Sequence, residues 1–122
     1  MKNIEIQEIA NKKSIHGVSL FTLTGSDGNG FYQQDAIRLI KEVEAEVIPI
    51  IGVDVYLLRN NKPTLTEGRD SWYCDRLKNE DLSHFTHRSC TSAIEYIQRY
   101  ISKEGIPLFD IIIFDTNRIL GD

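Results

Sequence analysis

Three side chains with metal-binding chemistry recur at every third position of one segment. His84, His87 and Cys90 would form a slanted row on a helix, since each step of three residues drifts about 60° around the axis. Imidazole nitrogens and thiolates bind zinc, but a zinc site needs a fourth ligand, and two histidines spaced this way are a weak pattern. We therefore expect no metal here and expect Cys90 to pack as a small hydrophobic residue.

The other cysteine, Cys74, would need a general base to act as a nucleophile. His84 and His87 are the nearest candidates, but no spacing requires them to meet Cys74. Its neighbours Trp72 and Tyr73 are typical of a core strand. Two cysteines are also too few for a disulfide framework, so we expect two free thiols in a reducing cytoplasm.

Asp54 and Asp75 are the candidates for catalysis by paired carboxylates, which requires two acids in one cleft with separated pKa values. Nothing in the sequence brings them together, so no catalytic residue is predicted. One alternative stays open, in which the Asp54/Trp72/Asp75 region forms the pocket of a small enzyme or ligand-binding domain.

A glycine-rich segment, Gly25-Ser26-Asp27-Gly28-Asn29-Gly30, resembles part of a calcium-binding EF-hand loop. In that register Gly25 and Ala36 stand where carboxylate ligands are needed. A phosphate-binding loop would need a lysine that is absent. We expect a flexible loop that ends at the start of a helix, and no cofactor.

Aromatic and charged residues gather in the middle of the chain, a composition common at protein–protein interfaces. The candidate partner-binding residues are Asp54, Tyr56, Glu67, Asp70, Trp72, Tyr73, Asp75 and Arg76. The alternative is that Trp72 and Tyr73 simply alternate along a strand, one buried and one half exposed, with solvated charges around them.

The predicted sheet is built around residues 50–58, a run of mainly β-branched and apolar residues with period-two alternation. Gly52 at its start indicates a bulge or a close approach of another backbone segment. Asn60-Asn61 predicts a tight hairpin, because asparagine tolerates positive φ. Residues 62–66 contain a proline and predict an edge strand or a loosely paired segment, followed by a strand at residues 71–74. One face should carry Val53, Val55 and Leu57, and the other Asp54, Tyr56 and Leu58.

Three segments have helical periodicity. We expect a short helix within residues 3–13, a second over 32–46, and a third of about 22 residues capped by Asn79 or Asp81. Residues 18–23 predict a short strand or extended segment. The second helix should bury Ala36, Ile37, Ile40, Val43 and Val47. The third should bury Leu82, Phe85, Ser89, Cys90, Ala93, Ile94, Tyr96, Ile97, Tyr100 and Ile101.

The third helix should end at a left-handed Gly105, with Pro107 after it. Residues 108–114 then form a nearly continuous apolar run, which predicts a strand covered on both faces. The chain of 122 residues reads as one α+β domain, residues 1–122, with a small mixed or antiparallel sheet packed against two main helices.

The formal net charge of −4 argues against nucleic acid or an anionic membrane as the main partner, since both need a basic surface. No apolar run approaches the ~20 residues of a membrane span, and the N-terminus lacks the apolar core of a signal peptide. We expect a cytoplasmic protein. Its oligomeric state stays open, and a structural subunit of a larger assembly is a third reading.

Two motifs and their order resemble the immunity protein 40 family of bacterial polymorphic toxin systems. The motifs are Gly52-Val53-Asp54-Val55-Tyr56 and, after a hairpin, Ser71-Trp72-Tyr73-Cys74. The resemblance covers residues 17–114, including a helix before the first motif and a long helix after the second. The chain departs from the family pattern at Val53, where a second glycine is expected, and in a longer glycine-rich loop.

The resemblance implies a non-enzymatic protein that binds a cognate toxin domain and blocks it. The mild acidity would suit a basic nuclease toxin, because surface carboxylates attract a positively charged partner and speed its association. The resemblance does not say which residues contact the toxin or what the toxin degrades.

Overall fold

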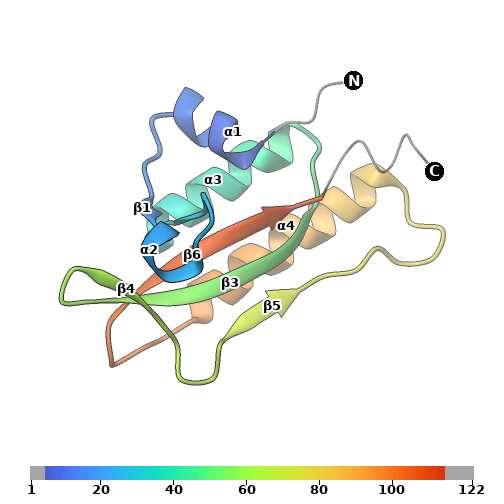
Figure 1. The fold of residues 1–122 in the computed structure, drawn as a ribbon. Helices are drawn as coiled ribbons and strands as arrows, with labels where there is room; N and C mark the ends of the chain where they lie inside the picture. The colour runs from blue at the N-terminus through green and yellow to red at the C-terminus, as the bar shows by residue number, and fades with distance from the viewer. Residues whose placement is uncertain (1–4, 115–122) are drawn as a thin grey trace.

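The computed structural model describes residues 5–114, which form an antiparallel sheet with helices on one face. Strand β3 (Ile50–Arg59) is the centre of this sheet (Figure 1). Strand β6 (Ile106–Ile113) pairs along the whole of one edge of β3. Strands β4 (Lys62–Leu65) and β5 (Ser71–Tyr73) share the other edge, one after the other. The predicted α+β class is confirmed. Of the two predicted alternatives, a mixed or an antiparallel sheet, the sheet is antiparallel.

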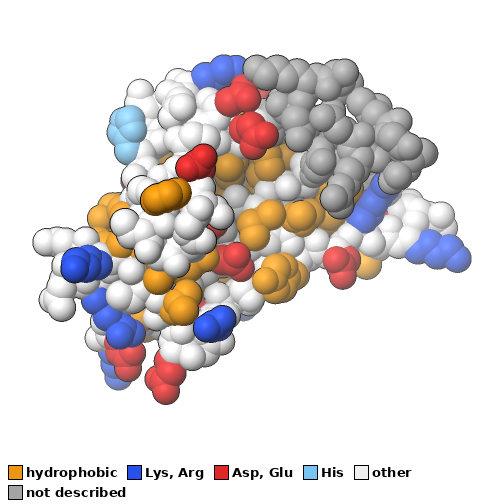
Figure 2. Space-filling model, in the orientation of Figure 1, with side chains coloured by type: hydrophobic (Ala, Val, Ile, Leu, Met, Phe, Trp, Pro, Cys, Tyr) orange, Lys and Arg blue, Asp and Glu red, His pale blue; other side chains and the backbone are white. Residues whose placement is uncertain are grey.

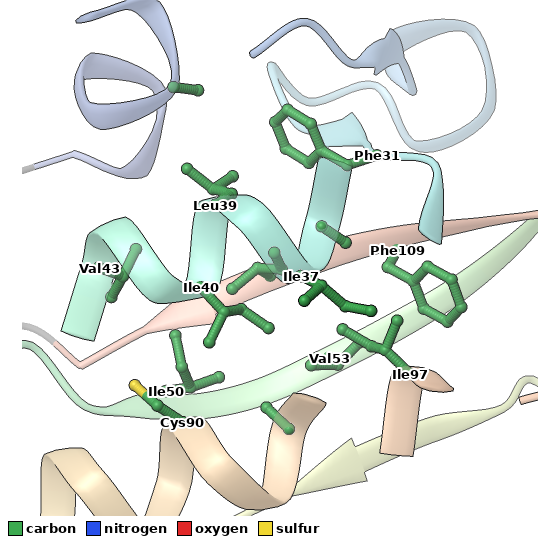
Figure 3. Close-up of a cluster of buried hydrophobic side chains, with 14 of the residues drawn as sticks. Phe31, Ile37, Leu39, Ile40, Val43, Ile50, Val53, Cys90, Ile97 and Phe109 are labelled. Atoms are coloured by element: carbon green, nitrogen blue, oxygen red, sulfur yellow. The ribbon is translucent and has the colours of Figure 1, made fainter. Parts of the chain in front are cut away.

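Two helices, α3 (Gln33–Ala45) and α4 (Leu82–Arg99), pack side by side on the same face of the sheet. The shorter helix α1 (Ile6–Lys12) packs against α3. Figure 3 shows the core between the layers, where side chains of α3 and α4 meet those of β3 and β6. Removing this apolar surface from water is the main stabilising contribution to the fold.

The period-two alternation predicted for β3 is present. Val53, Val55 and Leu57 are buried under the helices, whereas Asp54 and Tyr56 point to the opposite face. The pairing of β3 with β6 shifts register between Ile50 and Gly52, which agrees with the bulge, one of the two features predicted at Gly52. A buried hydroxyl supports this irregular start of the strand, because Ser89 Oγ of α4 accepts a 3.0 Å hydrogen bond from the Ile50 N–H.

The β3–β4 hairpin turns at Asn60 and Asn61, whose φ values of 51° and 64° confirm the predicted left-handed turn. A second hairpin joins β1 (Val18–Ser19) and β2 (Asn29–Gly30) through the single helical turn α2 (Phe21–Thr24). It is tied to the free edge of β6, since Phe31 and Phe109 exchange backbone hydrogen bonds of 2.9 and 2.8 Å.

The extended segment predicted for residues 18–23 is therefore only partly correct. The strand stops after Ser19, and residues 21–24 are helical. The glycine-rich segment is also not simply a flexible loop, because Leu20 N–H bonds the Gly28 carbonyl at 3.0 Å and residues 29–30 form β2. Gly25 does adopt positive φ, at 74°, and ends α2.

Both main helices are shorter than predicted. Asp81 caps α4 through a 2.7 Å bond from the His84 N–H, but the helix ends at Arg99, so Ile101 is 82% exposed instead of buried. Gly105 is consequently not a helix cap. It lies against β3, where an added Cβ would come within 2.9 Å of the Leu58 carbonyl oxygen.

Helix α3 also ends earlier than predicted. Val47, predicted as buried, lies beyond its end with φ 56° and is 45% exposed.

Strand β6 is covered by helices on one face only. Phe109 and Ile111 are buried against α3 and α4, as predicted. On the other face, Leu108 is covered by the β1–β2 hairpin, which contains the glycine-rich segment and is called the glycine hairpin here. Asp110 and Ile112 on that face are only partly buried. The prediction of a strand covered on both faces is wrong for this half. Among residues 5–114, no helix is long and apolar enough to cross a membrane.

Candidate functional site

The face of the sheet that points away from α3 and α4 is called the open face here. On this face, residues that are paired across neighbouring strands form rows, which the antiparallel register defines. Gly52 lies between Tyr73 of β5 and Ile112 of β6. The next two rows are Ser71–Asp54–Asp110 and Leu65–Tyr56–Leu108, followed by Pro63–Leu58–Ile106.

Two carboxylates meet in the middle of the open face. Asp54 and Asp110 are cross-strand partners, a position where like charges destabilise a sheet. Burial, and then the negative charge of Asp54, raise the pKa of Asp110 to about 6. Within residues 5–114, Asp110 forms no hydrogen bond or ion pair through its carboxyl group. A Cβ placed on Gly28 of the glycine hairpin would lie 3.3 Å from Asp110 Oδ2, so backbone shields one side of this acid.

Two phenol side chains lie beside the acids. The Tyr73 hydroxyl donates a long 3.5 Å hydrogen bond to Asp54 Oδ1, and the Tyr73 side chain is 67% exposed. Burial raises the pKa of Tyr56, and the charges of Asp54 and Asp110 add to the increase. The two phenol groups therefore lie close enough to the acid pair to interact with its negative charge.

Apolar side chains extend the open face toward its edges. Leu65 on β4 is 42% exposed and Ile106 on β6 is 53% exposed. Figure 2 shows hydrophobic and acidic side chains mixed over the strands of this face. A surface of aromatic, aliphatic and acidic groups can bury apolar area against a partner and also select the sign of its charge.

Trp72 and Asp70, two of the predicted partner-binding residues, lie on the helix side of the strand. The Trp72 ring stacks on Tyr96 of α4 at 6.4 Å between centroids, and Asp70 accepts a 2.6 Å hydrogen bond from the Tyr100 hydroxyl. Trp72 also lines a surface depression of about 430 Å³ with residues of α4, but Asp54 and Asp75 do not line it. Because Asp54 and Trp72 face opposite sides of the sheet, the Asp54/Trp72/Asp75 pocket does not form.

The remaining three predicted residues, Glu67, Asp75 and Arg76, are exposed in the loops that flank β5. Arg76 donates from Nε to the Glu80 carbonyl at 2.7 Å. The Asp75 carbonyl accepts a 2.6 Å bond from Arg88 of α4, so its position is held although its carboxylate is in solvent. Glu67 lies two residues beyond the end of β4, after the buried Thr66.

Arg88 and Glu80 form a clamp that fixes the loop after β5 to α4. Arg88 donates from Nε and Nη2 to the buried Glu80 carboxylate at 2.7 and 2.8 Å. The Leu77 N–H and His84 bond the same carboxylate. Hydrogen bonds from Arg88 are the largest cause that lowers the pKa of Glu80 well below its usual range. Every partner is internal, which indicates a structural role.

The histidines and cysteines do not assemble into a site. His84 and His87 are exposed and bond Glu80 and Glu44, respectively, whereas Cys90 is fully buried, and burial raises its pKa to about 12. No group of three or more potential metal ligands occurs in the part of the chain that the structure describes. Cys74 is a buried free thiol that accepts a 3.3 Å contact from Arg88.

Asp110 is the residue that the sequence analysis missed. Its signal was present, since it is an acid inside an apolar run, as Asp54 is. The apolar residues around Asp110, however, are typical of a strand covered on both faces. Only the pairing of β3 with β6 shows that the two acids share a row.

The chain was compared with protein-family models, curated proteins and solved structures. No curated protein and no solved structure gave a match. The family model described as immunity protein 40 matches residues 19–113, which run from β1 to the end of β6 and include the open face. Because this match covers most of the 122 residues, the chain belongs to the immunity protein 40 family.

Proposed function

We propose that this chain neutralises a cognate toxin domain by forming a stoichiometric complex with it, and that the open face makes the contact. Membership of an immunity protein family supports the role. The choice of surface rests on the central row of the open face, which holds the two carboxylates Asp54 and Asp110. They lie among exposed aromatic and aliphatic side chains and have no positive partner in residues 5–114.

The contact would be centred on Asp54, Tyr56, Tyr73 and Asp110. Tyrosine is enriched at the centres of interfaces because its ring buries area at a small cost in side-chain entropy while its hydroxyl stays bonded. The exposed Glu67, Asp75 and Arg76 would lie at the polar rim, where charges guide association more than they hold the complex. Asp70 and Trp72 would act indirectly, by holding β5 on the helix layer.

Binding without catalysis is the simpler mechanism for this site. The acid pair lies on an open sheet surface, and Tyr73, the neighbour of Asp54, is largely exposed. Enzyme sites are usually concave and exclude water around the reacting groups. The buried free thiols of Cys74 and Cys90 fit a reducing cytoplasm, where we place the complex.

A co-expression experiment tests the role. The protein encoded immediately upstream would be expressed in a bacterial host alone, with this chain, and with the Phe85→Ala variant, which removes a fully buried ring. We expect toxicity that wild-type chain relieves and the variant relieves poorly, because large-to-small core changes destabilise the fold by about 3–5 kcal/mol. Toxicity that the folded wild-type chain does not relieve would contradict the proposed function for that partner.

A further inference from the structure

The acid pair on the open face has no positively charged partner within residues 5–114. Asp54 and Asp110 face each other across the β3–β6 pairing, and neither forms an ion pair with lysine, arginine or histidine in residues 5–114. The Tyr73 hydroxyl gives Asp54 only a long hydrogen bond. A positive group between the two carboxylates would remove their repulsion and supply the missing donors.

We propose that the partner of this face places a basic side chain between Asp54 and Asp110, flanked by the rings of Tyr56 and Tyr73. This inference rests on the proposed function and adds the chemistry by which the partner is recognised. Arginine fits better than lysine, because its planar guanidinium has enough donors for both carboxylates and also stacks on aromatic rings.

A second copy of this chain fits the surface poorly. The register rows of the open face contain no lysine or arginine in β3, β4, β5 or β6 at the positions that point outward. Two such faces brought together would place four carboxylates at one interface. The cost of desolvating like charges opposes that assembly at neutral pH.

A metal ion fits poorly as well. Calcium takes six to eight oxygen ligands, and magnesium prefers an octahedral set. The row supplies two carboxylates, and the described residues hold no group of three potential ligand side chains at any place. A partner's basic side chain needs only the two acids and the neighbouring rings.

The arrangement predicts that binding is linked to a proton. Asp110 has a pKa of about 6 in the free chain, raised by burial and by Asp54. The other titratable groups on the open face are Tyr56 and Tyr73, and Asp27 is an exposed acid in the adjoining hairpin. A bound cation favours the ionised form of Asp110, so complex formation near pH 6 should release a proton, and affinity should fall as pH drops below about 6.

The experiment is calorimetric titration with an inactivated toxin domain from the protein encoded immediately upstream, at about pH 7.5 and about pH 5.5. Four chains would be compared: wild type, Asp54→Asn, Asp110→Asn, and the control Glu46→Gln. Glu46 is an exposed acid at the end of α3, on the helix layer, so its variant removes one charge far from the open face.

We expect Asp54→Asn and Asp110→Asn each to weaken binding at neutral pH by about 30-fold or more, since losing one member of a buried interfacial ion pair has effects of this size. Glu46→Gln should bind as wild type. The loss of affinity at acid pH should be clear for wild type and nearly absent for Asp110→Asn. The basic residues of the partner would then be replaced one at a time. The residue that contacts Asp110 should be the one whose replacement weakens binding to wild type but causes no further loss of affinity for Asp110→Asn.

The outcomes separate the two proposals. If wild type binds tightly and neutralises the toxin while both aspartate variants bind equally well, the acid pair does not receive a cation and this inference is wrong, although the proposed function stands. If the wild-type chain, shown to be folded, neither binds nor neutralises the upstream domain, the proposed function fails for that partner and this inference fails with it.

Discussion

Asp54 on β3 and Asp110 on β6 are directly opposed in the antiparallel register, on the face of the sheet that no main helix covers. Cross-strand neighbours of like charge repel, and the pKa of Asp110 rises to about 6 in response to burial and to Asp54. The free fold therefore carries a local destabilisation at neutral pH, at the site that we propose for partner binding.

The first prediction concerns the stability of Asp110→Asn. The folded pKa of about 6 exceeds the usual aspartate value, so the folded chain binds this proton more tightly than the unfolded chain. The penalty is present above pH 6 and disappears as pH falls toward about 4. Asp110→Asn should therefore raise the free energy of unfolding by about 1–3 kcal/mol at neutral pH.

Urea denaturation across this pH range, followed by circular dichroism, measures the effect. The difference between variant and wild type should shrink toward acid pH, and Glu46→Gln should show no such trend. A destabilised Asp110→Asn at neutral pH would mean that the Asp110 carboxylate makes a stabilising contact, contrary to the structure.

The second prediction concerns Glu80. Hydrogen bonds from Arg88, Leu77 N–H and His84 lower its pKa, so the ionised form contributes stability above the usual glutamate pKa. That contribution is lost as pH falls below about 4.5. Glu80→Gln should destabilise the chain at neutral pH and reduce its sensitivity to acid. Equal stability of wild type and Glu80→Gln at neutral pH would show that the clamp contributes nothing.

The third prediction tests where α4 ends. Ile97 and Ile101 fall one turn apart, but Ile97 is fully buried and Ile101 is 82% exposed beyond the helix. Ile97→Ala should reduce the free energy of unfolding by about 2–5 kcal/mol, and Ile101→Ala by less than about 0.5 kcal/mol. Chemical denaturation of the two variants in parallel gives both values. Similar losses would mean that the helix continues as its sequence pattern suggests.

The difference between these two isoleucines shows what the sequence can predict. The turn at Asn60-Asn61, the cap at Asp81 and the alternation of β3 depend on local chemistry, and each was predictable. The end of α4 depends on tertiary contacts. The Tyr100 ring packs on Phe109 at 5.7 Å and its hydroxyl bonds Asp70, and no spacing within the helix encodes either contact.

The candidate site was predictable in part for the same reason. Alternation along one strand places Asp54 and Tyr56 together, and the aromatic cluster pointed to residues 72 and 73. Which of Trp72 and Tyr73 faces the helices depends on the register of β5 against β3. Asp110 enters the site through a pairing between strands about fifty residues apart, which a single sequence does not specify.

The fourth prediction concerns the rate of association with the toxin domain. If the acidic open face attracts a basic partner, the association rate constant should fall about tenfold as salt rises from low to well above physiological concentration. The dissociation rate should change much less. Stopped-flow fluorescence of Trp72, the single tryptophan, provides a signal if the partner's approach alters β5. An association rate that does not respond to salt would remove the electrostatic part of the account.

The central claim is that this chain acts as a stoichiometric inhibitor, and titration of toxin activity tests it most directly. Purified chain would be added in steps to a fixed concentration of the active upstream toxin domain, well above the dissociation constant, and the remaining activity measured. The account predicts a linear decline that reaches its end at equimolar chain. Progressive loss of toxin activity at a small fraction of an equivalent, continuing with time, would show catalytic turnover and contradict it.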